Sequence, residues 1–133
     1  MHQWRVKDQV IAVTGASMGI GLGTVRCLLA RGARVALLAR DAARLAAVVE
    51  GLDEQRAFAV ATDVRDRAGI AAALGRVQSR WGRLDGIVNN VGFNFARRIE
   101  LMPEAEVRKV LELNFLGTVF GCQAAIPLLR ASG

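Results

Sequence analysis

Hydrophobic positions in this 133-residue chain follow two different periods. Short, almost uninterrupted apolar runs are typical of strands that a sheet buries on both faces. These runs cover residues 9–13, 34–39, 58–61 and 84–88. Between and after them, apolar residues recur three and four positions apart, which is the period of a helix packed along one side. These helical segments cover residues 23–31, 42–51, 66–82 and 104–130.

Strands that alternate with helices predict a parallel sheet with right-handed crossover connections. We therefore expect an α/β domain over residues 1–133, a partial doubly wound Rossmann fold with strand order 3-2-1-4. Local signals support the helix bounds, because Asp41 and Asp66 can cap helices and Gly32 and Gly82 can end them. Ligands of such sheets bind at the carboxyl ends of the strands.

A glycine-rich turn, residues 14–21 (Thr-Gly-Ala-Ser-Met-Gly-Ile-Gly), joins the first predicted strand to the first helix. A helix that begins there presents unpaired N–H groups and roughly half a positive charge to the turn. That arrangement favours a phosphate. Gly15 permits the turn, Gly19 allows a pyrophosphate close to the backbone, and Gly21 allows close packing of helix on strand. On this turn alone, an ordinary strand-to-helix connection is the alternative.

Two motifs in this order resemble those of the short-chain dehydrogenase/reductase family: the turn at 14–21 and Asn-Asn-Val-Gly at 89–92. The resemblance extends from residue 6 to residue 130. It implies an oxidoreductase that transfers a hydride between a nicotinamide cofactor and a small carbonyl or alcohol substrate. It also implies that the turn holds the pyrophosphate and adenosine side of the dinucleotide. The turn residues concerned are Gly15, Ser17, Met18, Gly19, Ile20 and Gly21.

Arg40 follows the second predicted strand, where a carboxylate would normally hold the ribose 2′-hydroxyl of NAD. A guanidinium suits a 2′-phosphate, which a carboxylate would repel. The sequence therefore favours NADP(H) over NAD(H). Asp41 is adjacent, but as a helix cap it should point away. The alternative is that Arg40 is an ordinary surface arginine.

Polar residues also follow the third and fourth strands. Asp63 and Val64 resemble the adenine contact of the family, with the Asp63 carboxylate accepting from the exocyclic amine; a plain turn aspartate is the alternative. Asn90, Val91 and Gly92 resemble the element that binds neighbouring backbone and the nicotinamide ribose. Val91 stands where the family usually has alanine, which adds bulk without removing a polar group.

Asn114 is the remaining candidate, and the only one predicted to lie on a helix. By the helical period it falls on an apolar stripe, so its amide should bond to backbone or water. The stripe comprises Val107, Val110, Leu111, Asn114, Thr118, Cys122 and Ala125. The family resemblance gives Asn114 a catalytic role, holding a water of the proton relay. A core asparagine without such a role is the alternative.

Composition removes several other functions. The net charge is +6, but the 18 basic residues are dispersed and not interleaved with aromatics, so we expect no nucleic-acid partner. No unbroken apolar run approaches the roughly 20 residues of a membrane span, and the first seven residues lack a signal-peptide core. We expect a cytoplasmic protein. Cys27 and Cys122 lack metal-ligand spacing, so we expect buried, reduced thiols and no metal.

The family reduces carbonyls with a Tyr, a Lys four positions later and a Ser. This sequence contains no Tyr, and its only lysines are Lys7 and Lys109. The chain thus resembles the cofactor-binding half of a longer enzyme, truncated before the Ser and Tyr-x-x-x-Lys region. We expect it to be inactive alone, to expose apolar surface, and to form a homo-oligomer if full length. The alternative is a non-catalytic NADP-binding module, or a subunit completed by another chain.

Overall fold

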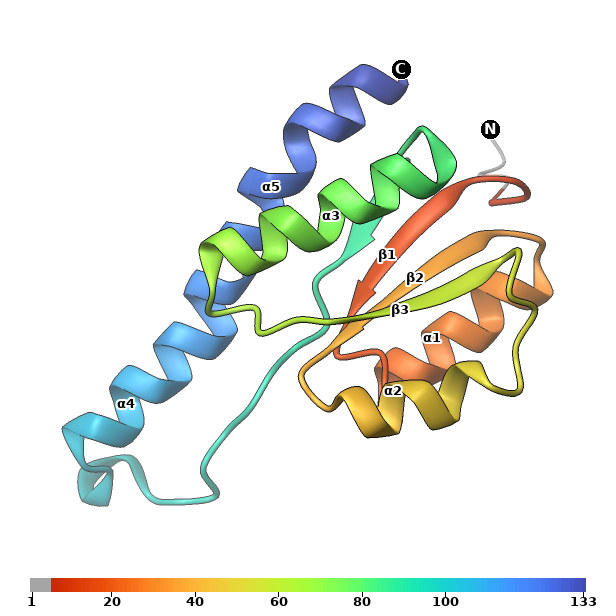
Figure 1. Cartoon of the computed structure of the whole chain (residues 1–133). Helices are drawn as coiled ribbons and strands as arrows, with labels where there is room; N and C mark the ends of the chain where they lie inside the picture. Colours follow the sequence, from red (N-terminus) through yellow and green to blue (C-terminus); the bar gives the residue numbers. More distant parts are fainter. Residues whose placement is uncertain (1–5) are drawn as a thin grey trace, which may run out of the picture.

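The computed structural model describes residues 6–133, and it is an open parallel sheet with helices on both faces (Figure 1). The first five residues, on which the expectation of no signal peptide partly rests, lie outside the described residues. The strands are β1 (Val10–Thr14), β2 (Arg34–Ala39), β3 (Ala57–Ala61) and β4 (Gly86–Val88). The helices are α1 (Gly19–Ala30), α2 (Ala42–Val49), α3 (Arg67–Trp81), α4 (Glu104–Val110) and α5 (Gly117–Ser132), with a short 3₁₀ turn, Ile99–Leu101, before α4.

The sheet has the predicted parallel order, β3-β2-β1-β4. β1 is fully buried, and β2 is buried from Val35 to Ala39, as expected for central strands covered on both faces. In register, Val13 of β1 pairs with Leu37 of β2 and with Val88 of β4. All four strands therefore end at the same edge of the sheet.

Alternate residues of each strand feed two separate hydrophobic cores. Val10 and Ala12 point to the face covered by α3 and α5, where Leu74 and Val77 pack against them. Ile11 and Val13 point to the other face, where they meet Val25 of α1 and Leu45 of α2. This period of two is what buries a parallel strand on both sides. Figure 1 shows the same two layers of helices around the sheet.

Asp41 and Asp66 cap α2 and α3 as predicted, accepting hydrogen bonds from the N–H of Arg44 and of Ala68. Gly82 ends α3 in the left-handed conformation, with φ of 73°. The start of α1 differs from the prediction, because the helix begins at Gly19 and not at residue 23. Gly19 and Gly21, which the sequence assigned to the turn, therefore lie in the first turn of the helix, whereas Gly15 stays in the turn.

The last helical segment is continuous from residue 104 to 132, but residues Leu111–Leu116 form a π-helical turn between α4 and α5. A π turn holds more residues than an α turn, so the buried side of the helix shifts. The buried stripe comprises Leu113, Gly117, Gly121 and Ala125. The predicted stripe was therefore wrong for Leu111 and Asn114, which are exposed. The α-helical period could not anticipate this shift.

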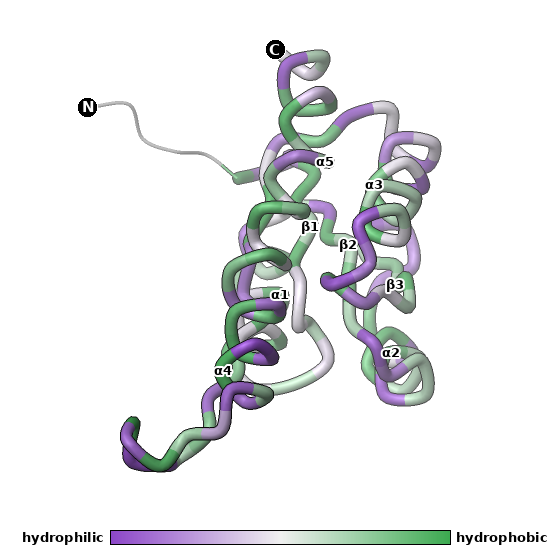
Figure 2. Tube along the Cα trace, turned by 90° about the vertical axis from the view of Figure 1, so that its left-hand side faces the viewer, coloured by the Kyte–Doolittle hydropathy of each residue, from purple (hydrophilic) through white to green (hydrophobic). Residues whose placement is uncertain are grey.

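By length and mean hydropathy alone, the helix from Glu104 to Ser132 could cross a membrane. The sequence prediction counted only unbroken apolar runs and missed it. One such helix is weak evidence for a span, although only 17% of its most apolar window is buried inside the protein. Here α5 packs against α3 and β4, and polar positions interrupt its apolar ones along its length (Figure 2).

The two cysteines are free thiols, but the prediction that both are buried was wrong. Cys27 is exposed on α1 and Cys122 is partly exposed on α5. A residue within an apolar helical segment is not necessarily buried, because only the side of the helix that faces the sheet is covered. On α1 that stripe includes Gly21 and Val25 and not Cys27.

Asp85 ties the start of β1 to the start of β4. One carboxylate oxygen accepts a hydrogen bond from the Val10 N–H at 2.8 Å, and Arg83 Nε donates to the same oxygen at 2.9 Å. Burial raises the pKa of Asp85, but the Arg83 and Val10 hydrogen bonds outweigh it, so the pKa lies below its usual value. The ionised form is thus favoured by folding.

We predict that Asp85→Ala lowers the free energy of unfolding at pH 7 by about 1–3 kcal/mol, because it leaves the Val10 N–H unpaired. The ionised Asp85 carboxylate contributes fully to the free energy of unfolding above the unfolded-state pKa of about 3.9. This contribution is lost as the pH falls through the lower pKa of the folded state. The difference from wild type should therefore shrink in acid. Urea unfolding measures it, with Asp85→Asn as a milder control that keeps an acceptor. Equal urea midpoints at pH 7 for wild type and Asp85→Ala would contradict the prediction.

Candidate functional site

Thr14, the last residue of β1, links the ends of two strands. Its hydroxyl donates to the Val88 carbonyl at 3.3 Å and accepts from the backbone N–H groups of Asn90 at 3.0 Å and Val91 at 3.3 Å. The side chain is almost fully buried. A single hydroxyl therefore fixes the turn after β1 against the Asn-Asn-Val-Gly segment after β4. Sequence reasoning missed this role, although Thr14 directly precedes the first glycine.

Asn90 completes the link from the other side. Its amide nitrogen donates to the Thr14 carbonyl at 3.1 Å and to the Gly15 carbonyl at 3.4 Å. Gly21 packs so closely here that an added Cβ would lie 2.1 Å from the Gly15 oxygen and 2.6 Å from the Asn90 amide nitrogen. Gly15 itself has a φ of 65°, which side chains rarely adopt. The spacing of the glycines is thus explained by close approach of backbone to backbone.

The N-terminus of α1 lacks the side-chain cap that α2 and α3 have. Met18 makes no capping bond there, and the first turn holds no acidic residue. The first helical bond runs from the Leu22 N–H to the Met18 carbonyl, which leaves the earlier N–H groups for a ligand. An added Cβ on Gly19 would meet nothing within 4 Å, so space lies open beside it. These features fit a bound phosphate.

A cavity of about 480 Å³ lies in front of this turn at the carboxyl ends of the strands. It brings together residues that sequence reasoning picked from four separate segments. Those lining it are Gly15, Ser17, Met18, Arg40, Val64, Asn90, Val91 and Gly92. Gly19, Ile20, Gly21, Asp63 and Asn114 do not line it. Among lining residues the sequence did not single out are Arg44, Thr62 and Leu113.

Arg40 stands at the end of β2 on the wall of this cavity. Its neighbour Asp41 accepts from the Arg44 N–H at 2.9 Å and caps α2 as predicted, but Asp41 also lines the cavity, so the expectation that it points away was wrong. Arg44 is held by Asp41 and donates to the Met18 sulfur at 3.0 Å. Among the described residues, no ion pair within 4.0 Å involves Arg40. An exposed guanidinium free of acid partners is suited to a phosphate.

Asp63 follows β3 and forms an ion pair with Arg65, whose Nη2 lies 2.6 Å from Asp63 Oδ2. The Arg65 side-chain hydrogen bonds are the largest influence and lower the pKa of Asp63; partial burial opposes them, and the charge of Arg40 adds to the lowering. The same contact raises the pKa of Arg65. The carboxylate is therefore ionised and engaged by its neighbour.

Asn114 bonds to backbone, as its helical position predicted. Its Oδ1 accepts from the Phe93 N–H and its Nδ2 donates to the Phe93 carbonyl, both at 2.8 Å. The side-chain amide of Asn114 thus makes the same two hydrogen bonds to the Phe93 backbone that a neighbouring strand would make. These bonds fix the position of the backbone directly after Gly92. The side chain lies on the π turn and not on the buried stripe. Its proposed part in a proton relay stays a prediction.

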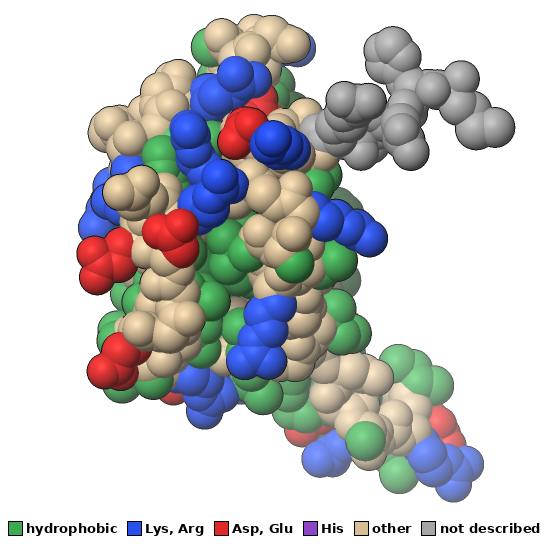
Figure 3. Space-filling model, turned by 90° about the vertical axis from the view of Figure 1, so that its right-hand side faces the viewer, with side chains coloured by type: hydrophobic (Ala, Val, Ile, Leu, Met, Phe, Trp, Pro, Cys, Tyr) green, Lys and Arg blue, Asp and Glu red, His purple; other side chains and the backbone are tan. Residues whose placement is uncertain are grey.

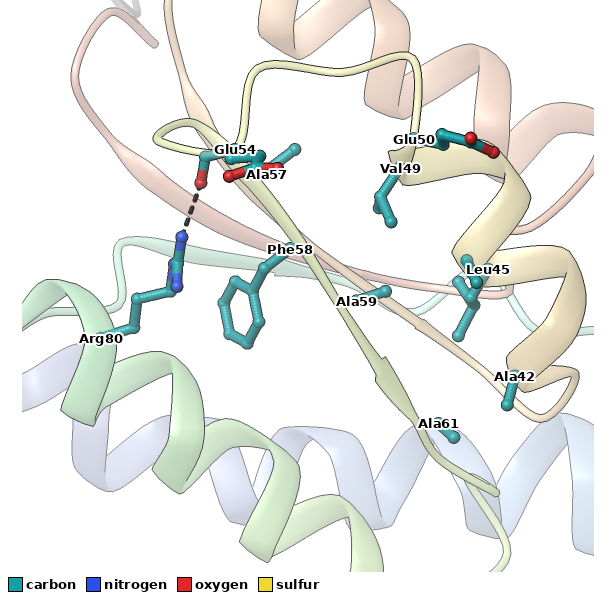
Figure 4. Close-up of a pocket in the computed structure, with 11 residues that line it drawn as sticks. Ala42, Leu45, Val49, Glu50, Glu54, Ala57, Phe58, Ala59, Ala61 and Arg80 are labelled. Carbon is teal, nitrogen blue, oxygen red and sulfur yellow. Dashed lines mark hydrogen bonds between the residues drawn. The ribbon is translucent and has the colours of Figure 1, made fainter.

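Another cavity, of about 490 Å³, lies between α2 and the outer edge of β3 (Figure 4). Alanine, leucine and valine side chains supply most of its wall, including Leu45, Val49 and Ala59. Arg80 at its rim donates to the Glu54 carbonyl at 2.6 Å. Glu50, Glu54 and Arg80 are its charged lining residues, and the N-terminus of α2, whose first residue Ala42 lines it, is already capped by Asp41. The cavity at the strand ends is therefore the better candidate site.

Within residues 6–133, no cluster of three or more His, Cys, Asp or Glu residues could hold a metal ion. Basic side chains on the face shown in Figure 3 are interrupted by acidic and apolar ones. This is the dispersed pattern that the sequence indicated.

Comparisons with known proteins agree with this geometry. The family model for short chain dehydrogenase matches residues 9–133. Levodione reductase of Leifsonia aquatica is 31% identical over 134 residues, which cover 97% of this chain and 50% of that protein. L-fucose dehydrogenase of Oryctolagus cuniculus is 36% identical over 129 residues, covering 96% of this chain and 45% of that protein.

Among solved structures, a 3-ketoacyl-(acyl-carrier-protein) reductase from Brucella melitensis complexed with NADH matches with a TM-score of 0.90 and 28% identity. The match covers 95% of this chain and 52% of that one. The chain spans about half the length of the curated relatives it matches. Family model, relatives and fold point to one conclusion: the chain belongs to the short chain dehydrogenase family.

Proposed function

We propose that this chain is the cofactor-binding part of an NADP(H)-dependent oxidoreductase. The observation that carries the proposal is the position of Arg40, which lines the cavity in front of the uncapped α1 N-terminus without an acid partner within 4.0 Å among the described residues. The α1 N–H groups would hold the pyrophosphate and Arg40 the 2′-phosphate. Asp63 and Val64 would lie at the adenosine end, and Asn90, Val91 and Gly92 at the nicotinamide end.

The reaction we propose for the whole protein is reduction of a small carbonyl compound or oxidation of an alcohol. The dinucleotide supplies or accepts the hydride. This chain's residues bind and orient it, and Asn114 fixes the backbone at Phe93 beside it. The sequence has no Tyr, so we propose that proton transfer depends on groups outside these 133 residues, which alone would be inactive. We further propose a cytoplasmic homo-oligomer that binds neither nucleic acid nor membrane.

A second candidate is a non-catalytic NADP-binding module or a subunit that another chain completes. The observation that favours it is the exposure of large apolar side chains on the long helix, among them Leu111, Phe115 and Ile126. Among the described residues, β4 also pairs only with β1, which leaves its other edge open within that part of the chain. Sedimentation of the purified chain, alone and with candidate partner chains, distinguishes this case. A monomer that binds NADPH and associates with nothing would exclude completion by another chain.

We predict that Arg40→Ala weakens NADPH binding about ten- to a hundredfold, because a charge-assisted hydrogen bond is worth about 1.5–3 kcal/mol. NADH binding should change little, since it lacks the 2′-phosphate. Calorimetric titration with both cofactors measures this. Arg31→Ala, which removes an exposed arginine at the other end of α1, is the matched control. Equal losses for NADPH and NADH would refute the 2′-phosphate assignment.

We predict that Gly21→Ala abolishes detectable binding of both cofactors, because the new methyl group would collide with the Gly15 carbonyl and displace the helix end. Gly23→Ala is the control two residues later, where a Cβ meets nothing within 4 Å. That change should preserve binding and stabilise the helix by about 0.5–1 kcal/mol. Fluorescence titration with the reduced cofactors measures binding. Unimpaired binding by Gly21→Ala would show that the close contact is dispensable.

A further inference from the structure

A second, smaller cavity of about 250 Å³ continues from the proposed cofactor site, because Arg40, Val91, Gly92 and Leu113 line both. Its other walls are Arg65, Phe93 and Lys109. Arg65 is thus a third arginine at this site, after Arg40 and Arg44. Nothing in the cofactor motif accounts for it.

Asp63 engages two of the three guanidinium nitrogens of Arg65. Its Nε lies 3.1 Å from Asp63 Oδ1 and 3.2 Å from Oδ2, and its Nη2 lies 2.6 Å from Oδ2. The Arg65 backbone N–H donates to Oδ1 at 3.0 Å as well. One residue therefore takes most of the roughly four acceptor positions of the Asp63 carboxylate. In return, Asp63 fixes the plane of the guanidinium.

Charge argues against a second phosphate-binding arginine here. The Asp63 carboxylate neutralises Arg65 at close range, and Glu112 adds further negative potential at Arg65. Arg40 has no such partner within 4.0 Å among the described residues. What Arg65 retains for a ligand is its Nη1 group, which makes no hydrogen bond among the described residues, and its flat face, which packs well on aromatic rings. The apolar side chain of Leu113 in the same cavity also suits a flat heterocycle.

We propose that Arg65, held in place by Asp63, stacks on the adenine ring of the bound dinucleotide. The inference rests on the proposed function and deepens it, because it assigns the adenosine end of the same site. Arg65 would contact the base, whereas Asp63 would act through Arg65 as a positioning residue. The contact is independent of the 2′-phosphate, so it serves NADPH and NADH alike.

The test is titration of wild type, Arg65→Ala and Arg65→Lys with NADPH, NADH and reduced nicotinamide mononucleotide, which lacks the adenosine half. We expect both variants to bind NADPH and NADH about three- to thirtyfold more weakly, the range of a cation–π contact. Binding of the mononucleotide should not change. Lysine keeps the charge but lacks the planar face, so it should not rescue. Arg76→Ala, on exposed α3 surface, is the control, and circular dichroism checks folding.

If the Arg65 variants bind NADPH more weakly but bind NADH as wild type does, Arg65 contacts the 2′-phosphate and the inference is wrong. If Arg65→Lys binds both cofactors with wild-type affinity, the charge of Arg65 matters and not its planar face, which would also overturn the inference.

A double-mutant cycle tests the role of Asp63. If it acts through Arg65, Asp63→Ala with Arg65→Ala should weaken binding no more than Arg65→Ala alone. Additive losses would contradict this and favour direct contact of Asp63 with the base. If wild type binds no dinucleotide at all, the proposed function itself fails, which is a distinct result.

Discussion

The site depends on one close contact, the packing of Gly21 at the start of α1 against the Gly15 carbonyl and the Asn90 amide. Only a residue without a Cβ allows the helix to begin so near to the end of β1. Thr14 and Asn90 then bind this junction to the segment after β4 through hydrogen bonds of 3.0–3.4 Å. The carboxyl ends of β1 and of the edge strand β4 are thereby joined beside the cavity.

That junction also decides where an anion can bind. Asp41 and Asp66 satisfy the N-termini of α2 and α3 with their own carboxylates, whereas no side chain of residues 6–133 caps α1. A helix end that is neither capped nor acidic needs a partner for its N–H groups. The same difference explains why the apolar cavity beside α2 is a poor candidate, although its volume is similar. The two cavities differ in the chemical groups that line them and not in their volume, and only the cavity at the strand ends lies before an uncapped helix N-terminus.

The sequence predicts most of the fold, because strong apolar runs and well-placed Asp and Gly residues mark the strands and helix ends. It also predicts the residues that line the cavity from the turn, from Arg40 and from Asn90 to Gly92. It fails where neighbours in space decide the outcome. The π turn rotates Asn114 off the stripe that its period implied. Arg65 and Thr14 gain their importance from partners that only the folded structure identifies, namely Asp63 beside one and the segment after β4 beside the other.

The measurement that tests this account most directly is hydrogen exchange of the backbone amides with and without saturating NADPH. We expect slower exchange at residues 17–21 and 90–92, because the bound dinucleotide would occupy the open N–H groups at the start of α1 and cover the segment after β4. Protection confined to residues 42–61, around the cavity between α2 and β3, would place the ligand elsewhere and contradict the central claim.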